Sequence, residues 1–123
     1  MGKWLRAQGA AGVVSLTITG EAKRLIEVYG VVCGTDDAGS MTSVPKVVIS
    51  NVQYADGTVA DYVITPEEGG ATANLARGIV HTPPALYKKI IPQGLSTIIT
   101  YTSGPVTGAP SLHVCFTRTL PGV

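Results

Sequence analysis

Residues 91–102, IPQGLSTIITYT, and residues 111–119, SLHVCFTRT, decide the fold that the sequence predicts. In the second segment Leu112, Val114 and Phe116 alternate with polar side chains. A period of two is that of a β-strand with one face on a core and the other on a more polar environment. We therefore interpret the two segments as a β-hairpin that closes a β-sandwich.

The composition indicates a single all-β domain. A chain of 123 residues fits one domain with one core. Val, Ile and Thr together account for 38 residues, and the chain has 15 Gly and 8 Pro. Because β-branched side chains suit pleated sheets while Gly and Pro favour turns, we predict a β-sandwich or jelly roll of about eight strands. This domain is expected to span residues 13–123, after an extended N-terminal arm in residues 1–12.

The other strands are predicted from apolar segments bounded by turn residues. They are expected at residues 13–19, 23–33, 46–54, 58–65, 74–81 and 85–91, where 74–81 also suits a partly helical turn. Asp56-Gly57 is a strong hairpin signal between two of these segments, because both residues accept positive φ. Within residues 23–33, Gly30 is expected to mark a β-bulge or a close backbone approach.

Charge is scarce and unevenly distributed. Charged residues make up 14% of the chain against a usual share of about 25%, which burial against neighbouring subunits would explain. No apolar run reaches the roughly 18 residues of a membrane-spanning helix, so we expect no membrane partner. All eight acidic residues lie in residues 1–68, whereas residues 69–123 hold four basic residues. Opposite potentials would let subunits meet head to tail, although four scattered bases without a role explain the pattern equally well.

The arm is the predicted contact with partners. Its candidate binding residues are Lys3, Trp4, Leu5 and Arg6. A chain terminus normally frays, so an isolated Trp beside a Leu favours docking on an adjacent subunit. The alternative is that Trp4 covers the open end of its own core. Because no long apolar segment follows the basic start, we expect a chain without a secretion signal that is made in the cytoplasm.

Candidate catalytic residues are few. The histidines are His81 and His113, and His113 shares the polar face of the last strand with Cys115. Neither an orienting Asn or Asp nor a turn that presents a nucleophile accompanies this pair. The spacing of Cys33 and Cys115 matches no zinc or redox motif, so we expect buried free thiols. A disulfide between them remains the alternative. We therefore expect no enzyme and no cofactor.

Candidate ligand sites are equally sparse. Asp36 and Asp37 lie in a polar loop, but the alternating acids and closing Glu of an EF-hand calcium loop are missing, and Asx-turn chemistry explains them. Tyr54 and Tyr62 are expected to be neighbours across the Asp56 hairpin. They could form a platform that binds sugar, but a role in the core or at its rim is favoured. Lys and Arg are not clustered with aromatic residues, so no specific nucleic acid is expected.

Four segments characterise the chain as a whole. They are the basic arm MGKWLRAQGAAG (1–12), the turns ADGT (55–58) and IPQG (91–94), and the closing SLHVCFTRTL (111–120). A low-charge sandwich rich in Val, Thr and Gly with these segments resembles small virion proteins of tailed phages. The resemblance implies a capsid decoration, minor capsid or head-to-tail connecting subunit of the virion, which binds copies of itself and other virion proteins as a homo-oligomer. A carbohydrate-binding or adhesive β-sandwich module is the alternative.

Overall fold

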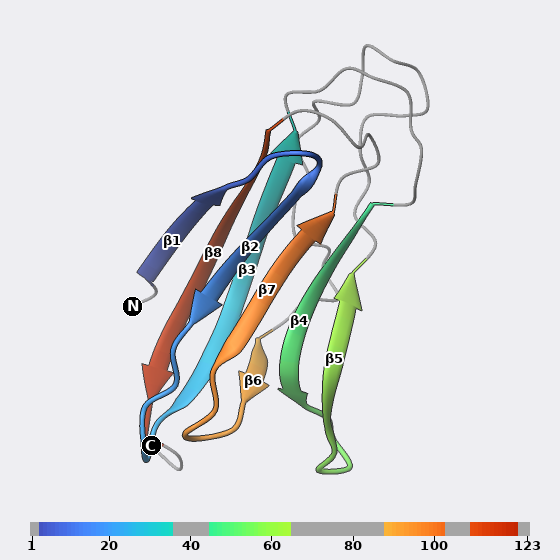
Figure 1. Ribbon diagram of the computed structural model, residues 1–123. Helices are drawn as coiled ribbons and strands as arrows, with labels where there is room; N and C mark the ends of the chain where they lie inside the picture. Colours follow the sequence, from blue (N-terminus) through green and yellow to red (C-terminus); the bar gives the residue numbers. More distant parts are fainter. Residues whose placement is uncertain (1–2, 36–44, 65–87, 103–108, 121–123) are drawn as a thin grey trace.

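The computed structural model describes residues 3–35, 45–64, 88–102 and 109–120. Within these ranges the chain forms eight strands and no helix (Figure 1). The strands are β1 (Lys3–Gln8), β2 (Val13–Ile18), β3 (Leu25–Thr35), β4 (Lys46–Gln53), β5 (Val59–Ile64), β6 (Lys89–Ile91), β7 (Thr97–Thr102) and β8 (Pro110–Thr119). Sheet A has the order β1-β8-β3-β6 and sheet B the order β2-β7-β4-β5. The predicted all-β sandwich is confirmed.

The strand order is that of a jelly roll. The first strand pairs with the last, the second with the seventh, the third with the sixth, and the fourth with the fifth, all antiparallel. Pairing of β8 with β3 and of β7 with β4 completes each sheet. Eight strands wound in this way form the double-sheet jelly roll. One lateral edge of the sandwich is therefore formed by β1 over β2, and the other by β6 beside β4 and β5 (Figure 1).

The predicted closing hairpin is wrong. β7 lies in sheet B, where it pairs with β2 and β4, whereas β8 lies in sheet A, where it pairs with β1 and β3. Both strands carry an apolar face toward the same core, one from each sheet. The alternation of apolar and polar residues shows which face of a strand is buried. It does not show whether two such strands pair within one sheet or face each other across the core.

Local turn signals were predicted correctly. β4 and β5 form the expected hairpin around Gly57, which has a φ of +90°. The Gly57 amide donates to the Tyr54 carbonyl at 2.9 Å, and the Asp56 carboxylate accepts bonds from the amide and the hydroxyl of Thr58 at 3.0 and 2.7 Å. In β3 the register against β8 shifts next to Gly30, which confirms the predicted β-bulge.

The strand bounds also follow the sequence pattern closely. The predicted segments 13–19, 23–33, 46–54 and 58–65 correspond to β2, β3, β4 and β5 within two residues. Residues 74–81 lie outside the described residues. Of the predicted segment 85–91, the structure describes the end, which contains β6.

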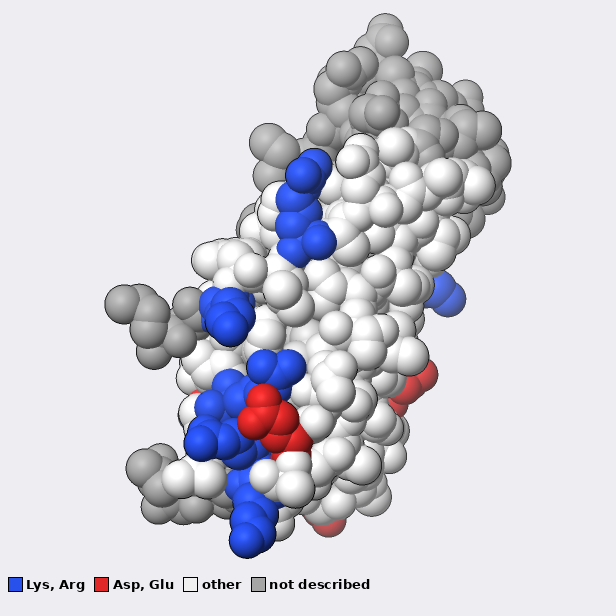
Figure 2. All heavy atoms as spheres, turned by 60° about the vertical axis from the view of Figure 1, so that its left-hand side comes forward, with Lys and Arg blue, Asp and Glu red and all other residues white. Residues whose placement is uncertain are grey.

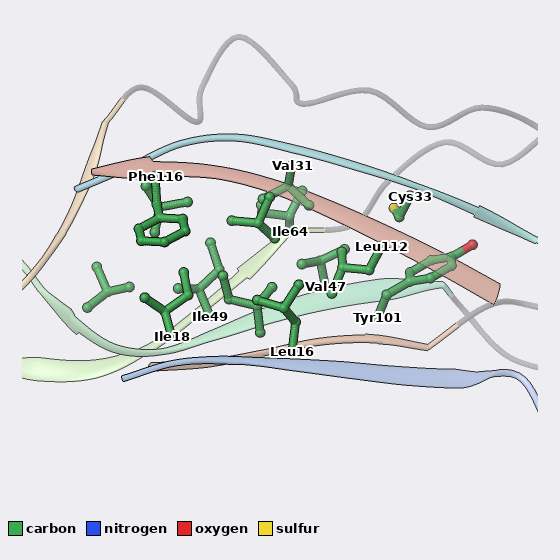
Figure 3. Packing of buried hydrophobic residues seen from close by; sticks show 14 of the residues in the cluster. Leu16, Ile18, Val31, Cys33, Val47, Ile49, Ile64, Tyr101, Leu112 and Phe116 are labelled. Atoms are coloured by element: carbon green, nitrogen blue, oxygen red, sulfur yellow. The ribbon is translucent and has the colours of Figure 1, made fainter. Parts of the chain in front are cut away.

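The core lies between the two sheets (Figure 3). Leu112, Val114 and Phe116 of β8 point inward and are buried, as the alternation predicts. From sheet B they meet other buried side chains, among which Ile99 and Tyr101 of β7 are inaccessible to solvent. Each fully buried side chain of this size contributes about 1.5–3 kcal/mol of hydrophobic stabilisation. The core therefore holds the two sheets together and leaves their outer faces for other roles.

Residues 3–8 of the predicted arm form the edge strand of sheet A. β1 pairs with β8 of its own chain, from Lys3 opposite Phe116 to Gln8 opposite Ser111. Leu5 is half-buried and packs against the core. The described residues of the arm thus belong to the sandwich.

Candidate functional site

A pocket rich in basic side chains opens at the end of the sandwich where β1 begins and β8 ends. It has a volume of about 320 Å³. Its lining residues are Lys3, Glu21, Arg24, Phe116, Thr117 and Arg118. Three basic side chains against one acidic one leave this basic pocket with a net charge of +2. Figure 2 turns the edge that carries β1 toward the viewer and shows Lys and Arg gathered around an acidic residue at its lower end.

Contacts with neighbouring groups orient the arginine of β8. The Arg118 Nε donates to the Thr19 carbonyl at 3.0 Å and lies 3.4 Å from the Glu21 Oε2. Its guanidinium carbon lies 5.2 Å from the centre of the Phe116 ring, within the range of a cation–π contact. The Glu21 Oε1 lies 3.7 Å from the Arg24 Nε. Both arginines thus share one carboxylate at the pocket wall.

The turn that carries Glu21 and Arg24 is held in place by backbone hydrogen bonds. The Arg24 amide donates to the Glu21 carbonyl at 3.2 Å. The amide of Gly94, in the connection from β6 to β7, donates to the carbonyls of both residues at 3.1 Å. One wall of the basic pocket is therefore fixed by a segment 70 positions away along the chain.

The basic pocket is suited to bind a planar anion. A guanidinium group offers five N–H donors in a fork that matches a carboxylate or phosphate. The ion pairs of Arg24 and Arg118 with Glu21, and the Arg118 hydrogen bond to Thr19, are made through Nε. Exposed ion pairs such as these contribute only about 0–1 kcal/mol to stability.

The four predicted binding residues are divided between the two sides of β1. Trp4 and Arg6 lie on the outer face, and 57% of the Trp4 surface is exposed. Lys3 lines the basic pocket, whereas Leu5 packs inward. The edge strand therefore exposes Trp4 and Arg6 on its outer face, while Leu5 packs against the core.

The predicted pair of His113 and Cys115 lies on the outer face of sheet A, and both residues are half-buried. His113 sits between Arg6 and Val32, and Cys115 lies beside Trp4. The register thus places basic, apolar and aromatic neighbours around the pair. An orienting acid does not face either residue across the described strands.

The two cysteines lie on opposite faces of sheet A. Cys33 is buried in the core, Cys115 is half-buried on the outer face, and no disulfide joins them. Among the described residues, no group of three or more His, Cys, Asp or Glu is placed to hold a metal ion. Asp36, Asp37 and His81 lie outside the described residues. In the described ranges there is no helix long and apolar enough to span a membrane.

At the opposite lateral edge, Tyr54 and Tyr62 are neighbours, as predicted. Their ring centres lie 6.5 Å apart with a tilt of 50° between the planes. The Tyr54 hydroxyl donates to the Asp61 carbonyl at 2.7 Å, and the Lys89 Nζ lies 4.3 Å from the centre of the Tyr62 ring. Tilted rings with a cation over one of them are typical of a packed rim.

A polar cluster on the outer face of sheet A surrounds Glu27. Its Oε1 accepts hydrogen bonds from Tyr29 at 2.8 Å and from Thr117 at 3.4 Å, and its Oε2 lies 3.2 Å from the Lys88 Nζ. Burial by itself raises the pKa of Glu27, but the Tyr29 hydrogen bond and Lys88 outweigh it, so the pKa lies below 4.5. The cluster therefore ties Lys88, which directly precedes β6, to β3 and β8 while Glu27 is ionised.

The outer face of sheet B is almost uncharged. Val13, Ile98 and Val63 are exposed on it, from strands β2, β7 and β5. Between them the hydroxyls of Ser15 and Thr100 form a hydrogen bond of 3.1 Å. A face of Val, Ile, Ser and Thr has little electrostatic cost to bury against another protein.

Sequence reasoning missed the basic pocket as a site. Its residues come from positions 3, 21, 24 and 116–118, so no local cluster of bases reveals it. Lys3 was predicted as a binding residue, but on the basis of the arm. The pairing of β1 with β8 and the β2–β3 turn bring the bases together.

No protein-family model matches the chain, and no curated protein matches it. Among solved structures, it is similar to a chain in the structure of infectious bursal disease virus, Gx strain, with 15% sequence identity and a TM-score of 0.18. The alignment covers 98% of this chain and 35% of that one, so this chain spans about a third of the viral protein's length. A likeness at this TM-score carries no argument about fold or function.

Proposed function

We propose that the chain is a non-enzymatic structural subunit of a virion that associates with copies of itself and docks on capsid or tail proteins. The observation that carries the proposal is the set of apolar side chains that the jelly roll leaves exposed on a low-charge surface. Trp4 on sheet A and Val13, Val63 and Ile98 on sheet B each expose more than 40% of their surface. Exposed aromatic and aliphatic groups rimmed by polar residues are typical of protein interfaces.

The fold is compatible with this role and with one other. Jelly rolls occur in viral capsid domains and also in lectins, so the architecture admits both the virion role and the sugar-binding alternative. The resemblance of the chain's segments to small tailed-phage virion proteins favours the first. Sheets that expose their outer faces and edge strands offer surfaces for neighbouring subunits.

Mass spectrometry of particles purified from cells that carry the gene tests the virion role. We expect the chain in the particles at a fixed ratio to the other structural proteins. Its absence from intact particles would refute the proposal.

A point substitution tests Trp4 as a docking residue better than deletion of the N-terminus, because residues 3–8 form β1 and their loss would strip an edge from sheet A. Trp4→Ser keeps the strand and removes the indole, so incorporation into particles should fall at least about tenfold if this is an interface anchor. Gln8→Ala, on the same face at the other end of β1, is the matched control.

The sugar-binding alternative rests on the Tyr54 and Tyr62 pair. Lys89 lies over the Tyr62 ring, and Tyr54 is the more exposed of the two tyrosines. A glycan array separates the two roles. Binding that is lost on Tyr54→Ala would favour the sugar-binding module, whereas we expect no glycan to bind.

A further inference from the structure

We propose that the basic pocket of one copy receives the acidic β4–β5 hairpin of a second copy, so that subunits join head to tail. This inference rests on the proposed self-association and names its interface. The partner is a second copy of this chain because the chain itself carries the complementary charge, exposed, at the other side of the sandwich.

The acidic side of the interface is the segment 47–64. It contains Asp56 and Asp61 and no basic residue, so its net charge is −2. Both aspartates are exposed. The side-chain hydrogen bond from Thr58 lowers the pKa of Asp56, so this carboxylate is ionised at neutral pH. The charge of the acidic hairpin is therefore opposite in sign to the +2 charge of the basic pocket and equal to it in size.

The two surfaces are placed for a head-to-tail contact. The basic pocket lies at the lateral edge formed by β1, and the acidic hairpin lies at the edge formed by β5 (Figure 1). Figure 1 also shows that β8 ends and β5 begins at the same end of the sandwich, which is the end where the pocket-lining residues 116–118 lie. Because the two surfaces lie at opposite edges of the sandwich, the hairpin of a subunit cannot enter the pocket of the same subunit. Contacts of this heterologous kind generate a ring if they close and a filament if they do not.

Apolar groups accompany the charges on both sides. Trp4 follows Lys3 in β1 and is largely exposed on the outer face of sheet A, while Val59 and Val63 flank Asp61 in β5 and are exposed as well. An arginine fork on a carboxylate gives direction, and burial of an indole against aliphatic groups gives affinity. The two edges therefore combine the residue types that dominate binding at interfaces.

The test uses two variants that each disable one side. The pocket variant is Lys3→Glu with Arg24→Glu, two exposed residues whose exchange leaves Arg118 and its bond to Thr19 in place. The hairpin variant is Asp56→Asn with Asp61→Asn, which removes both charges without adding a basic one; Asn can keep the turn, and the contact of Tyr54 uses the Asp61 backbone carbonyl. Lys46→Glu, a charge reversal on an exposed residue at the other end of β4, is the control.

Sedimentation velocity at about 50 mM salt, where exposed charges are screened least, measures the outcome. We expect the wild type and Lys46→Glu to associate, and each disabled variant alone to bind at least about tenfold more weakly. An equimolar mixture of the two disabled variants should form a dimer and nothing larger, since it contains one intact pocket and one intact hairpin per pair. Thermal unfolding of each variant checks that it is folded.

The proposal is overturned if either disabled variant associates like the wild type, if the mixture stays monomeric, or if the wild type is a monomer at millimolar concentration. Failure here is distinguishable from failure of the virion role. If the chain is found in particles but both disabled variants associate like the wild type, the proposed function stands and this interface is refuted. If the chain is absent from particles but the two disabled variants form a dimer when mixed, the interface stands and the proposed function is refuted.

Discussion

The substitution Thr97→Val tests how β4, which leads into the acidic hairpin, is fastened to the sandwich. Thr97 is a buried polar residue of the core, with no solvent-exposed surface. Its hydroxyl donates to the Ser50 carbonyl at 2.7 Å, and the Ser50 hydroxyl accepts from the Ile98 amide at 2.8 Å. These bonds lie beyond the last regular β4–β7 pair, where the register of β4 shifts and Asn51 has a φ of +60°. Side-chain bonds thus replace the ladder here.

The expected cost follows from this geometry. Valine keeps the shape of threonine but removes the donor, so one hydrogen bond worth about 1 kcal/mol is lost and the Ser50 carbonyl loses its partner. Ser50 is half-buried, so water compensates part of that second penalty. We expect the free energy of unfolding to fall by about 1–2 kcal/mol in total. For a domain of this size the melting temperature should drop by about 4–8 °C.

Urea unfolding followed by circular dichroism measures the effect, with Thr17→Val as the matched control. Thr17 is exposed on β2, so the same exchange there should change stability by less than about 0.5 kcal/mol. If Thr97→Val is as stable as the wild type, the side-chain bonds do not fasten β4, and the position of the acidic hairpin would need another explanation.

Three further predictions concern the core, the polar cluster and the thiols. Leu112→Ala should lower the free energy of unfolding by about 3 kcal/mol, because it leaves a cavity at a fully buried position; a loss below about 1 kcal/mol in urea unfolding would contradict the packing. Glu27→Gln should cost about 1 kcal/mol at pH 7. The pKa of Glu27 is lower in the folded state than its value near 4.5 in the unfolded state. The stability that the wild type gains over Glu27→Gln is therefore fully present above pH 4.5 and is lost as the pH falls through the folded pKa. The urea midpoints of the two proteins should converge at low pH. A thiol reagent should modify Cys115 in the native protein and Cys33 only after unfolding, and native reaction of both would contradict the burial of Cys33.

Several features of the fold were predictable from sequence because their causes are local. The inward face of β8, the hairpin at Asp56-Gly57 and the β-bulge at Gly30 each depend on alternation or on backbone freedom within a few residues. The neighbourhood of Tyr54 and Tyr62 followed directly from that hairpin. Local patterns therefore determined which residues face the core and where the chain turns.

The partner of each strand was decided only by the tertiary structure. Lys3 pairs across from Phe116, and neither residue carries a local signal for the other. Pairing over such distances depends on how all eight strands share one core, which is why the predicted pairing of β7 with β8 failed. The basic pocket has the same origin. The sequence by itself determined a low-charge, all-β sandwich, and the jelly-roll winding brought Lys3, Arg24 and Arg118 together, because charges far apart in the chain become neighbours only when strands pair.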